Sequence, residues 1–365
     1  MMIRRQLLLA SKPQISPKHR VKDLDQLRQL LQSALKLELT TIPPYLCALY
    51  SIKEGSNPEA VQAIVSVAME EMLHMALAAN VLNAIGGTPI VNEKEFVPSY
   101  PQNVKTLNMT IPLERFCKDS IDTFIEIERP DDEVHSQPCA GCCHFDDAKS
   151  IAQFYDLIKC GLTDLSENGT KNIFDGDPER QIGPEQYYGS GGVITHVSDL
   201  TTAITAIDEI IGQGEGIPHS IWAGSGPTTG RADYLEVAHF YRFLEIRKER
   251  RYSGHETVPP ANGKYPLPTG EKMHVSWGDV YPMRKNPKMA DLPSGSEVLK
   301  KSIAFNRTYT DLLNTLNLAM NGKPDLIMKS VGIMYELKYQ AIELMRIPMP
   351  GCKDETVGPS FEFLG

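Results

Sequence analysis

The chain has 365 residues, of which 41% are hydrophobic and 23% are charged, and its formal net charge is −9 at pH 7. This length is enough for one large domain, or two ordinary ones, with a substantial core. A net negative charge argues against proteins that bind nucleic acid or anionic membranes, because both classes present basic surfaces. We therefore expect no nucleic-acid partner.

The N-terminal stretch MMIRRQLLLA joins two arginines to a short apolar run, which Ser11, Lys12 and Pro13 interrupt. A secretory signal needs an apolar core of about 7–15 residues, and a membrane span needs roughly 18. We expect neither in this chain. Seven cysteines, an odd number, fit a reducing compartment better than a disulfide scaffold. These features predict a cytoplasmic protein with no membrane partner, and an N-terminal arm over residues 1–20.

The first strong helical pattern begins near Val21. Apolar residues recur at i, i+3 and i+4 spacing, and Glu38 falls on the same, core-facing side. Because proline removes a backbone donor and clashes with the preceding turn, Pro43 and Pro44 predict a kink or break just after Glu38. Tyr45 follows these prolines and either packs in the core or lines a substrate pocket.

A second helix is expected over about residues 58–85, ended by a Gly-Gly pair and Pro89. It is apolar on nearly every side, which is typical of a buried helix. Glu71 and His74 nevertheless lie in its middle, three residues apart and on one face. Burying an unpaired carboxylate costs several kcal/mol unless it is neutralised or coordinated. The pair therefore indicates a buried functional site.

The rest of the chain predicts further helices and very little strand, so the fold class is mostly α. Strand-like alternation is scarce, and a Pro/Gly-rich stretch without periodicity is expected to wrap the surface at residues 253–295. The other predicted helices lie at about residues 112–127, 147–165, 197–215, 231–251, 295–320 and 324–346.

The predicted helix at residues 231–251 repeats the Glu-x-x-His spacing with Glu236 and His239 on its inward face. Such spacing arises by chance in many sequences. The chain contains its own control, because Glu271 and His274 match as well but lie in a loop without helical periodicity. We interpret that third match as chance.

Four-helix carboxylate sites take a Glu-x-x-His from each of two helices and one Glu from each of the other two. Glu38 supplies one single Glu. The helix predicted at 197–215 offers Glu209 or Glu215 for the other, and Glu215 is preferred because it is in phase with the apolar face.

These acids and imidazoles predict a ferritin-like four-helix bundle over residues 21–252, with long insertions and a C-terminal helical extension over residues 253–365. Mixed oxygen and nitrogen ligands without thiolate suit two iron ions, with manganese as an alternative. Glu71 and Glu236 are expected to bridge the ions, and both, with Glu38, are the predicted catalytic residues. The remaining alternative is a bundle in which these groups only hydrogen-bond to one another. The predicted ligand set is Glu38, Glu71, His74, Glu215, Glu236 and His239.

Two other features leave their roles open. The stretch QPCAGCCHFDD lacks the Cys-x-x-Cys-His spacing of haem attachment, so we interpret it as an ordinary loop, with a redox pair or incidental metal loop as the alternative. Glu128 lies near a helix end before Pro130, and we interpret it as a structural contact, with a place in a substrate pocket as the alternative. The Cys-rich loop contains Cys139, Cys142, Cys143 and His144.

Several stretches of the sequence resemble the ferritin-like family named for iminophenyl-pyruvate dimer synthase, known from the violacein pathway. Those stretches are LELTTIPPYLCALYSI, EEMLHMALAANVLNAIGG, IIGQGEG, HFYRFLEI and GPSFEF. Members of that family couple imines derived from aromatic amino acids, but they are much longer chains. The resemblance implies a ferritin-like portion with a C-terminal extension, and its IIGQGEG stretch favours Glu215 over Glu209.

The expected function is that of a diiron oxidoreductase that uses O2 on a small molecule of secondary metabolism, derived for example from an amino acid. One alternative is imine coupling, or a non-redox partner role, in either case without a required metal. Another is iron storage with ferroxidase activity, although long insertions oppose packing into a cage. A homo-oligomer is compatible with the sequence, which does not identify the substrate.

Overall fold

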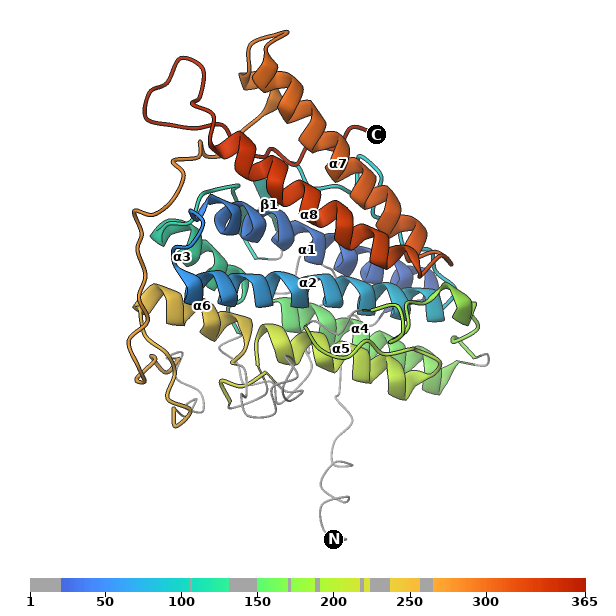
Figure 1. The fold of residues 1–365 in the computed structure, drawn as a ribbon. Helices are drawn as coiled ribbons and strands as arrows, with labels where there is room; N and C mark the ends of the chain where they lie inside the picture. Colours follow the sequence, from blue (N-terminus) through green and yellow to red (C-terminus); the bar gives the residue numbers. More distant parts are fainter. Residues whose placement is uncertain are drawn as a thin grey trace.

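The structure is a computed structural model that describes residues 21–105, 107–130, 150–169, 172–187, 191–216, 220–223, 237–256 and 265–365. Within them the chain forms eight α-helices and one two-stranded antiparallel sheet (Figure 1). The sheet joins β1 (Gln102–Val104) to β2 (Met109–Ile111), with Asn103 opposite Thr110. The prediction of a mostly α fold is confirmed.

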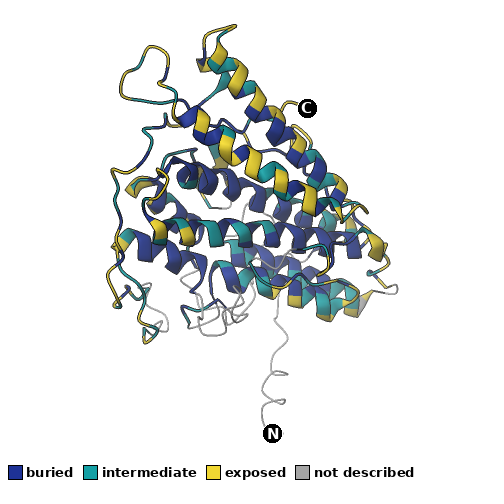
Figure 2. Cartoon of the chain, in the orientation of Figure 1, coloured by how far each residue is buried: buried dark blue, intermediate teal, exposed yellow. Residues whose placement is uncertain are grey.

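Two long helices, α1 (Leu24–Ser51) and α2 (Pro58–Ala84), lie side by side at the centre of the molecule (Figure 1). Asp23 caps α1 by accepting a hydrogen bond from the backbone N–H of Gln26 at 2.8 Å. Both helices are buried along most of their length, as their dark blue colour in Figure 2 shows. Their facing sides therefore form the core of the bundle.

Of the kink or break predicted just after Glu38, the break is wrong, because the helix runs without interruption through Pro43 and Pro44. The kink stays a prediction. A proline in a helix leaves the carbonyl four residues earlier without its N–H partner. For Pro44 that carbonyl belongs to Thr40, and the hydroxyl of Tyr100 donates to it at 2.8 Å. This tertiary contact satisfies the group that a break would have exposed to water.

A four-helix bundle has four helix positions, of which α1 and α2 fill two. Each of the other two positions is filled by two shorter helices in place of one long helix. α3 (Lys118–Ile127) and α4 (Ile151–Asn168) both pack against α1, whereas α5 (Leu200–Gly214) and α6 (His239–Lys248) both pack against α2. α3 contacts α6 and α4 contacts α5, so the breaks within the two pairs face each other (Figure 1). The four-helix bundle thus has two continuous and two divided positions.

The helix predicted at 231–251 begins later, at His239. Val237 forms an isolated β-bridge with Trp222, and the N–H of Ala238 donates to the carbonyl of Ile221 at 2.9 Å. These residues are extended because their backbone groups pair with that neighbouring segment. A single helical turn joining Glu236 to His239 is therefore wrong, and Glu236 lies outside the described residues.

The C-terminal part contributes two helices, α7 (Glu297–Ala319) and α8 (Leu326–Met345), of which α8 packs on α1. The final segment is buried where Phe361 packs edge-on against Phe305 and Tyr309. Residues 265–295 have no α-helix, as expected of a surface wrap. The arm at residues 1–20 lies outside the described residues, and the division at residue 252 stays a prediction.

α2 is the one helix among the described residues that is long and apolar enough to span a membrane by length and composition. Two thirds (67%) of the qualifying window is buried inside the protein. A central core helix passes the same test, so this feature agrees with the position of α2 in the bundle.

Candidate metal centre

Buried carboxylates and imidazoles gather where α1 and α2 face the breaks in the two divided positions. Glu38 comes from α1, and Glu71 and His74 come from α2. Glu128 is the C-terminal cap of α3, and His239 is the first residue of α6. Each is at most 2% exposed. Two side chains are therefore positioned by helix ends and not by helix interiors.

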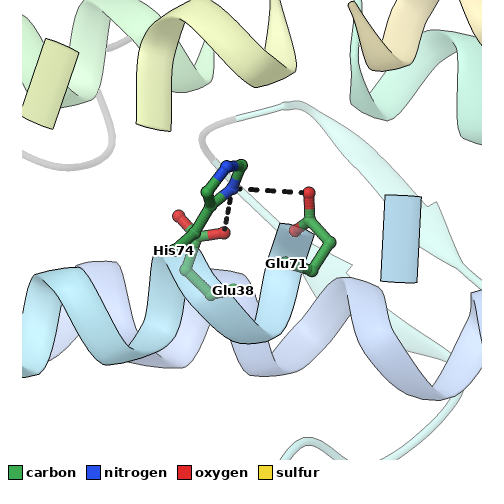
Figure 3. Close-up of side chains that lie close together, drawn as sticks. All are labelled: Glu38, Glu71 and His74. Atoms are coloured by element: carbon green, nitrogen blue, oxygen red, sulfur yellow. Dashed lines mark ion pairs between the residues drawn. The ribbon is translucent and has the colours of Figure 1, made fainter. Parts of the chain in front are cut away.

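The first group of ligating atoms comprises Glu38, Glu71 and His74 (Figure 3). His74 Nδ1 lies 3.6 Å from Glu38 Oε2 and 3.6 Å from Glu71 Oε1. Figure 3 shows the three side chains close together on the same side of α1 and α2. The spacing predicted from the sequence does bring these residues together.

A second group comprises Glu71, Glu128 and His239. His239 Nδ1 lies 3.0 Å from Glu71 Oε1 and 3.5 Å from Glu128 Oε2. The rings of His74 and His239 are stacked with their centroids 5.4 Å apart. Glu71 thus belongs to both groups, and its Oε1 faces both imidazoles. Counting Glu71, each group has two carboxylates and one imidazole.

Each of the four carboxylates around the site accepts a hydrogen bond from a protein donor through one of its oxygens. Tyr155 donates to Glu38 Oε1 and Tyr45 donates to Glu128 Oε1. These contacts leave the Oε2 atoms of Glu38 and Glu128, like Oε1 of Glu71, directed at the imidazoles. The remaining two contacts run from Thr41 Oγ1 to Glu71 Oε2 at 2.7 Å and from the N–H of Ala152 to Glu215 Oε1 at 2.7 Å.

The outer nitrogen of His74 contacts Gln213, with Nε2 and Oε1 2.9 Å apart. The amide nitrogen of Gln213 donates to the carbonyl of Gly191 at 2.7 Å and to Glu209 Oε1 at 2.9 Å. Because both of these neighbours only accept, the oxygen of Gln213 faces His74 and accepts from its Nε2–H. In neutral His74 the lone pair is therefore on Nδ1, which faces the site.

Gly191 and Gly192 allow the chain to approach this network closely. Both have positive φ, at +92° and +127°, a region that residues with a side chain rarely adopt. A Cβ at Gly192 would lie 2.5 Å from Gln213 Nε2, and one at Gly191 would lie 3.1 Å from the backbone nitrogen of Glu70. The glycine pair is thus required by the contact between this segment and the site.

The outer nitrogen of His239 contacts a carboxylate, with Nε2 2.7 Å from Glu70 Oε2. Arg242 binds the other oxygen of Glu70 at 3.0 Å and donates to Ser66 Oγ at 2.9 Å. Burial opposes ionisation of Glu70, but Arg242 and His239 outweigh it and hold its pKa below the usual range. An ionised Glu70 accepts from Nε2–H, so the second imidazole also directs Nδ1 at the site.

Burial and like charge oppose ionisation of the inner acids. Burial raises the pKa of Glu38 to about 7 despite the hydrogen bond from Tyr155. Burial and the charge of Glu71 also raise the pKa of Glu128. Burial lowers the pKa of His74, whereas for His239 the surrounding carboxylates outweigh burial and raise it. Several acids in a dry site with this little positive charge are stabilised by protons or by bound cations.

The arrangement fits metal ions. His239 Nδ1 is buried and has no hydrogen-bond partner among the described residues, although it faces two carboxylates. A cavity of about 10 Å³ lies beside Glu38, Glu71, His74, Glu128 and Glu215, which is about the room that one water molecule needs. Carboxylate and imidazole ligands without thiolate suit iron or manganese.

The structure adds one donor to the set expected from the sequence. Glu128, which the sequence suggested as a structural contact, lies with Oε2 3.5 Å from Nδ1 of His239. Glu236 lies outside the described residues, so its role as a ligand stays a prediction. Glu215 is the C-terminal cap of α5, and His239 is the first residue of α6. The sequence offered one signal for the role of Glu128, namely that it is an acid at the end of a predicted helix.

The other predicted residues fall into three classes. Glu215 lines the cavity but belongs to neither three-residue group, and Glu209 is half-buried and accepts from Gln213. Tyr45 is fully buried and its hydroxyl donates to Glu128. Its contact with a substrate stays a prediction. Outside the described residues lie Cys139, Cys142, Cys143 and His144.

A family model described as Ferritin-like matches residues 31–248, which is more than half of the chain. The chain belongs to the Ferritin-like family. A crystal structure of a ferritin-like protein from Caulobacter vibrioides has the same fold, with a TM-score of 0.59, 23% identity and coverage of 88% of this chain and 96% of that one. The ferritin-like fold predicted from the sequence is confirmed.

Two curated relatives of this ferritin-like protein are much longer than it is. Dichlorochromopyrrolate synthase of Lentzea aerocolonigenes is 22% identical over 411 residues, which cover 96% of this chain and 37% of the synthase. The 2-imino-3-(indol-3-yl)propanoate dimerase of Chromobacterium violaceum is 25% identical over 268 residues, which cover 62% of this chain and 23% of the dimerase. The resemblance drawn from the sequence is thereby confirmed at the level of the family.

Proposed function

We propose that this ferritin-like protein is a dinuclear iron oxidoreductase that uses O2 to oxidise a small, amino-acid-derived molecule. The observation that carries the proposal is the pair of three-residue groups that share Glu71 Oε1. Glu38 and His74 would hold one ion, Glu128 and His239 the other, and Glu71 would contact both. Two iron ions held there would supply redox chemistry with O2 that no side chain of the protein supplies.

The protein's own part is to hold these ligands in place and to exclude water. Tyr155, Thr41 and Tyr45 each fix one oxygen of a carboxylate, so that ion binding needs little rearrangement. Side chains of α4 and α5 close the cavity with an apolar wall that includes Ile151, Ile210 and Ile211. A dry surrounding strengthens the electrostatic attraction between the acids and a cation.

The cavity limits where a substrate can bind. A volume of about 10 Å³ holds a molecule the size of water, and not an amino acid. A substrate of that larger size would have to lie outside the wall formed by Ile151, Ile210 and Ile211. We therefore propose that an amino-acid-sized substrate binds outside this wall.

The test is metal analysis of the freshly purified protein, followed by O2 uptake after reduction. The proposal predicts close to two irons per chain and O2 consumption that needs both ions. Thousands of irons per particle would indicate storage instead. Glu271→Ala is the control, because Glu271 is exposed and outside the bundle, and it should leave the metal content unchanged.

The name of one relative, a dimerase of 2-imino-3-(indol-3-yl)propanoate, favours a second candidate, the coupling of imines. We propose this candidate in a form that requires no metal. The chain spans 37% and 23% of the two curated relatives, so coupling would have to proceed without the rest of their length. Metal-free protein incubated with 2-imino-3-(indol-3-yl)propanoate separates the two candidates. Joining two such imines by a new C–C bond removes two hydrogens, so the incubation contains a two-electron oxidant such as H2O2. A dimeric product from metal-free protein under these anaerobic conditions would replace the oxidase proposal.

A further inference from the structure

The two groups of the centre are matched in their inner atoms. Each contains the shared Glu71, one imidazole that presents Nδ1, and one further carboxylate. That further carboxylate accepts from a buried tyrosine in both cases, Tyr155 for Glu38 and Tyr45 for Glu128. The two positions therefore offer the same types of inner ligand.

The groups differ in what holds the outer nitrogen of each imidazole. His74 Nε2 donates to the neutral amide of Gln213 at 2.9 Å. His239 Nε2 donates to the carboxylate of Glu70 at 2.7 Å, and Arg242 at 3.0 Å stabilises the negative charge of that carboxylate. An anionic acceptor makes an imidazole a more basic metal ligand than a neutral acceptor does.

We propose that the two metal positions are inequivalent, so that the first ion binds beside His239 and the second, more weakly, beside His74. This inference rests on the proposed function only in taking the cluster to be a metal centre, and it does not need the O2 reaction. Glu70 and Gln213 are positioning residues, because they act through the imidazoles. Changes to such outer partners typically alter metal affinity by about 10–100-fold.

Glu70 and Gln213 are fixed well enough for this difference to persist. Glu70 is 1% exposed, and Arg242 that holds it is anchored by a hydrogen bond of 2.7 Å from Nε to the carbonyl of Val237. Gln213 is fully buried, and both of its amide hydrogens are used, by Gly191 and Glu209. Rotating the amide of Gln213 would break its hydrogen bonds to Gly191 and Glu209, and rotating the carboxylate of Glu70 would break its contact with Arg242.

The experiment is an anaerobic titration of the metal-free protein with Co²⁺, followed by calorimetry and by visible absorption. We expect two steps whose dissociation constants differ by about tenfold or more. His239→Ala should remove the tighter step and His74→Ala the weaker one. Two equal steps, or the opposite assignment of the steps to the two histidines, would overturn the inference.

Outer-partner variants test the cause of the difference. Glu70→Gln should weaken the tighter step by about 10–100-fold and leave the weaker step unchanged. Gln213→Leu removes the acceptor of the His74 Nε2–H, so it should weaken the weaker step further and leave the tighter step unchanged. Glu245→Gln is the matched control, because Glu245 is a buried acid of α6 that pairs with Arg251 at 2.7 Å, and both steps should keep their wild-type constants.

The outcomes separate this inference from the proposed function. Unequal steps in a protein that consumes no O2 after iron loading would support the inference and overturn the oxidase proposal. Equal steps with normal O2 uptake would do the reverse. If Glu70→Gln does not fold, as circular dichroism would show, the two histidine variants still decide the assignment.

Discussion

Glu128 Oε2 lies 3.5 Å from Nδ1 of His239, although one residue ends α3 and the other begins α6. The contact joins the two divided positions of the bundle at the level of Glu38 and Glu71. In a continuous four-helix bundle such ligands come from helix interiors. Here half of the centre depends on where two helices stop and start.

This contact predicts which acid the second ion needs. Glu128→Ala should lower the metal content from two ions to about one per chain, because it removes one of three donors beside His239. Metal analysis after desalting measures the effect. The companion variant Glu126→Ala, which removes an exposed acid near the end of α3, should retain both ions, and a Glu128→Ala protein that still holds two ions would contradict this role.

The tyrosine hydroxyls should stabilise the metal-free fold. Tyr155→Phe removes the donor to Glu38 and leaves a buried oxygen without its partner, so the free energy of unfolding should fall by about 1–3 kcal/mol. Urea denaturation of the metal-free protein measures this. Tyr335→Phe is the control, because Tyr335 is 61% exposed on α8, and a loss no larger than that of the control would refute the role.

Burial of Glu38 predicts a specific pH dependence for the metal-free protein. Its pKa is about 7 in the folded state against the ordinary value of 4.5 for a glutamate in water, so the folded state binds more protons between these values. The free energy of unfolding should therefore fall as pH rises from about 4.5 to about 7, by on the order of 3 kcal/mol. Glu38→Gln, which stays neutral, should flatten this slope.

Bound metal should reverse that trend. An ion competes with the proton of Glu38 for the same carboxylate, so metal affinity should increase as pH rises toward 7. Titrations with Co²⁺ at several pH values measure it. An affinity independent of pH over this window would contradict ligation by Glu38.

Two glycines should respond to alanine in opposite directions. Gly192→Ala places a Cβ 2.5 Å from Gln213 Nε2 at a φ of +127°, so we expect a loss of stability of at least about 1–3 kcal/mol. Gly332 lies within α8, and a Cβ added there would meet no atom within 4 Å, so Gly332→Ala should stabilise the protein by up to about 1 kcal/mol. Thermal unfolding compares them.

Much of the bundle could be predicted from periodicity. The bounds of α2, α5, α7 and α8 lie within a few residues of those expected, because each has a continuous apolar face and clear end signals. The continuity of α1 through Pro43 and Pro44 could not be predicted, since the compensating hydroxyl of Tyr100 comes from a distant segment. Local sequence cannot reveal that contact.

The same limit applies to the centre. Glu38, Glu71 and His74 lie on helix interiors, where i, i+3 spacing determines which side chains share a face. Glu128 and His239 meet across two helix ends, a relationship set by how the divided positions pack. Glu236-x-x-His239 had the spacing of one helical turn, but residues 237 and 238 are extended. The i, i+3 rule for helices therefore does not apply to this pair.

Anomalous diffraction from crystals of the iron-loaded protein tests the central claim most directly. The account predicts two iron peaks about 3.5–4 Å apart, one bound by Nδ1 of His74 and one by Nδ1 of His239, with Glu71 contacting both. A single peak, or peaks that contact neither imidazole, would contradict it.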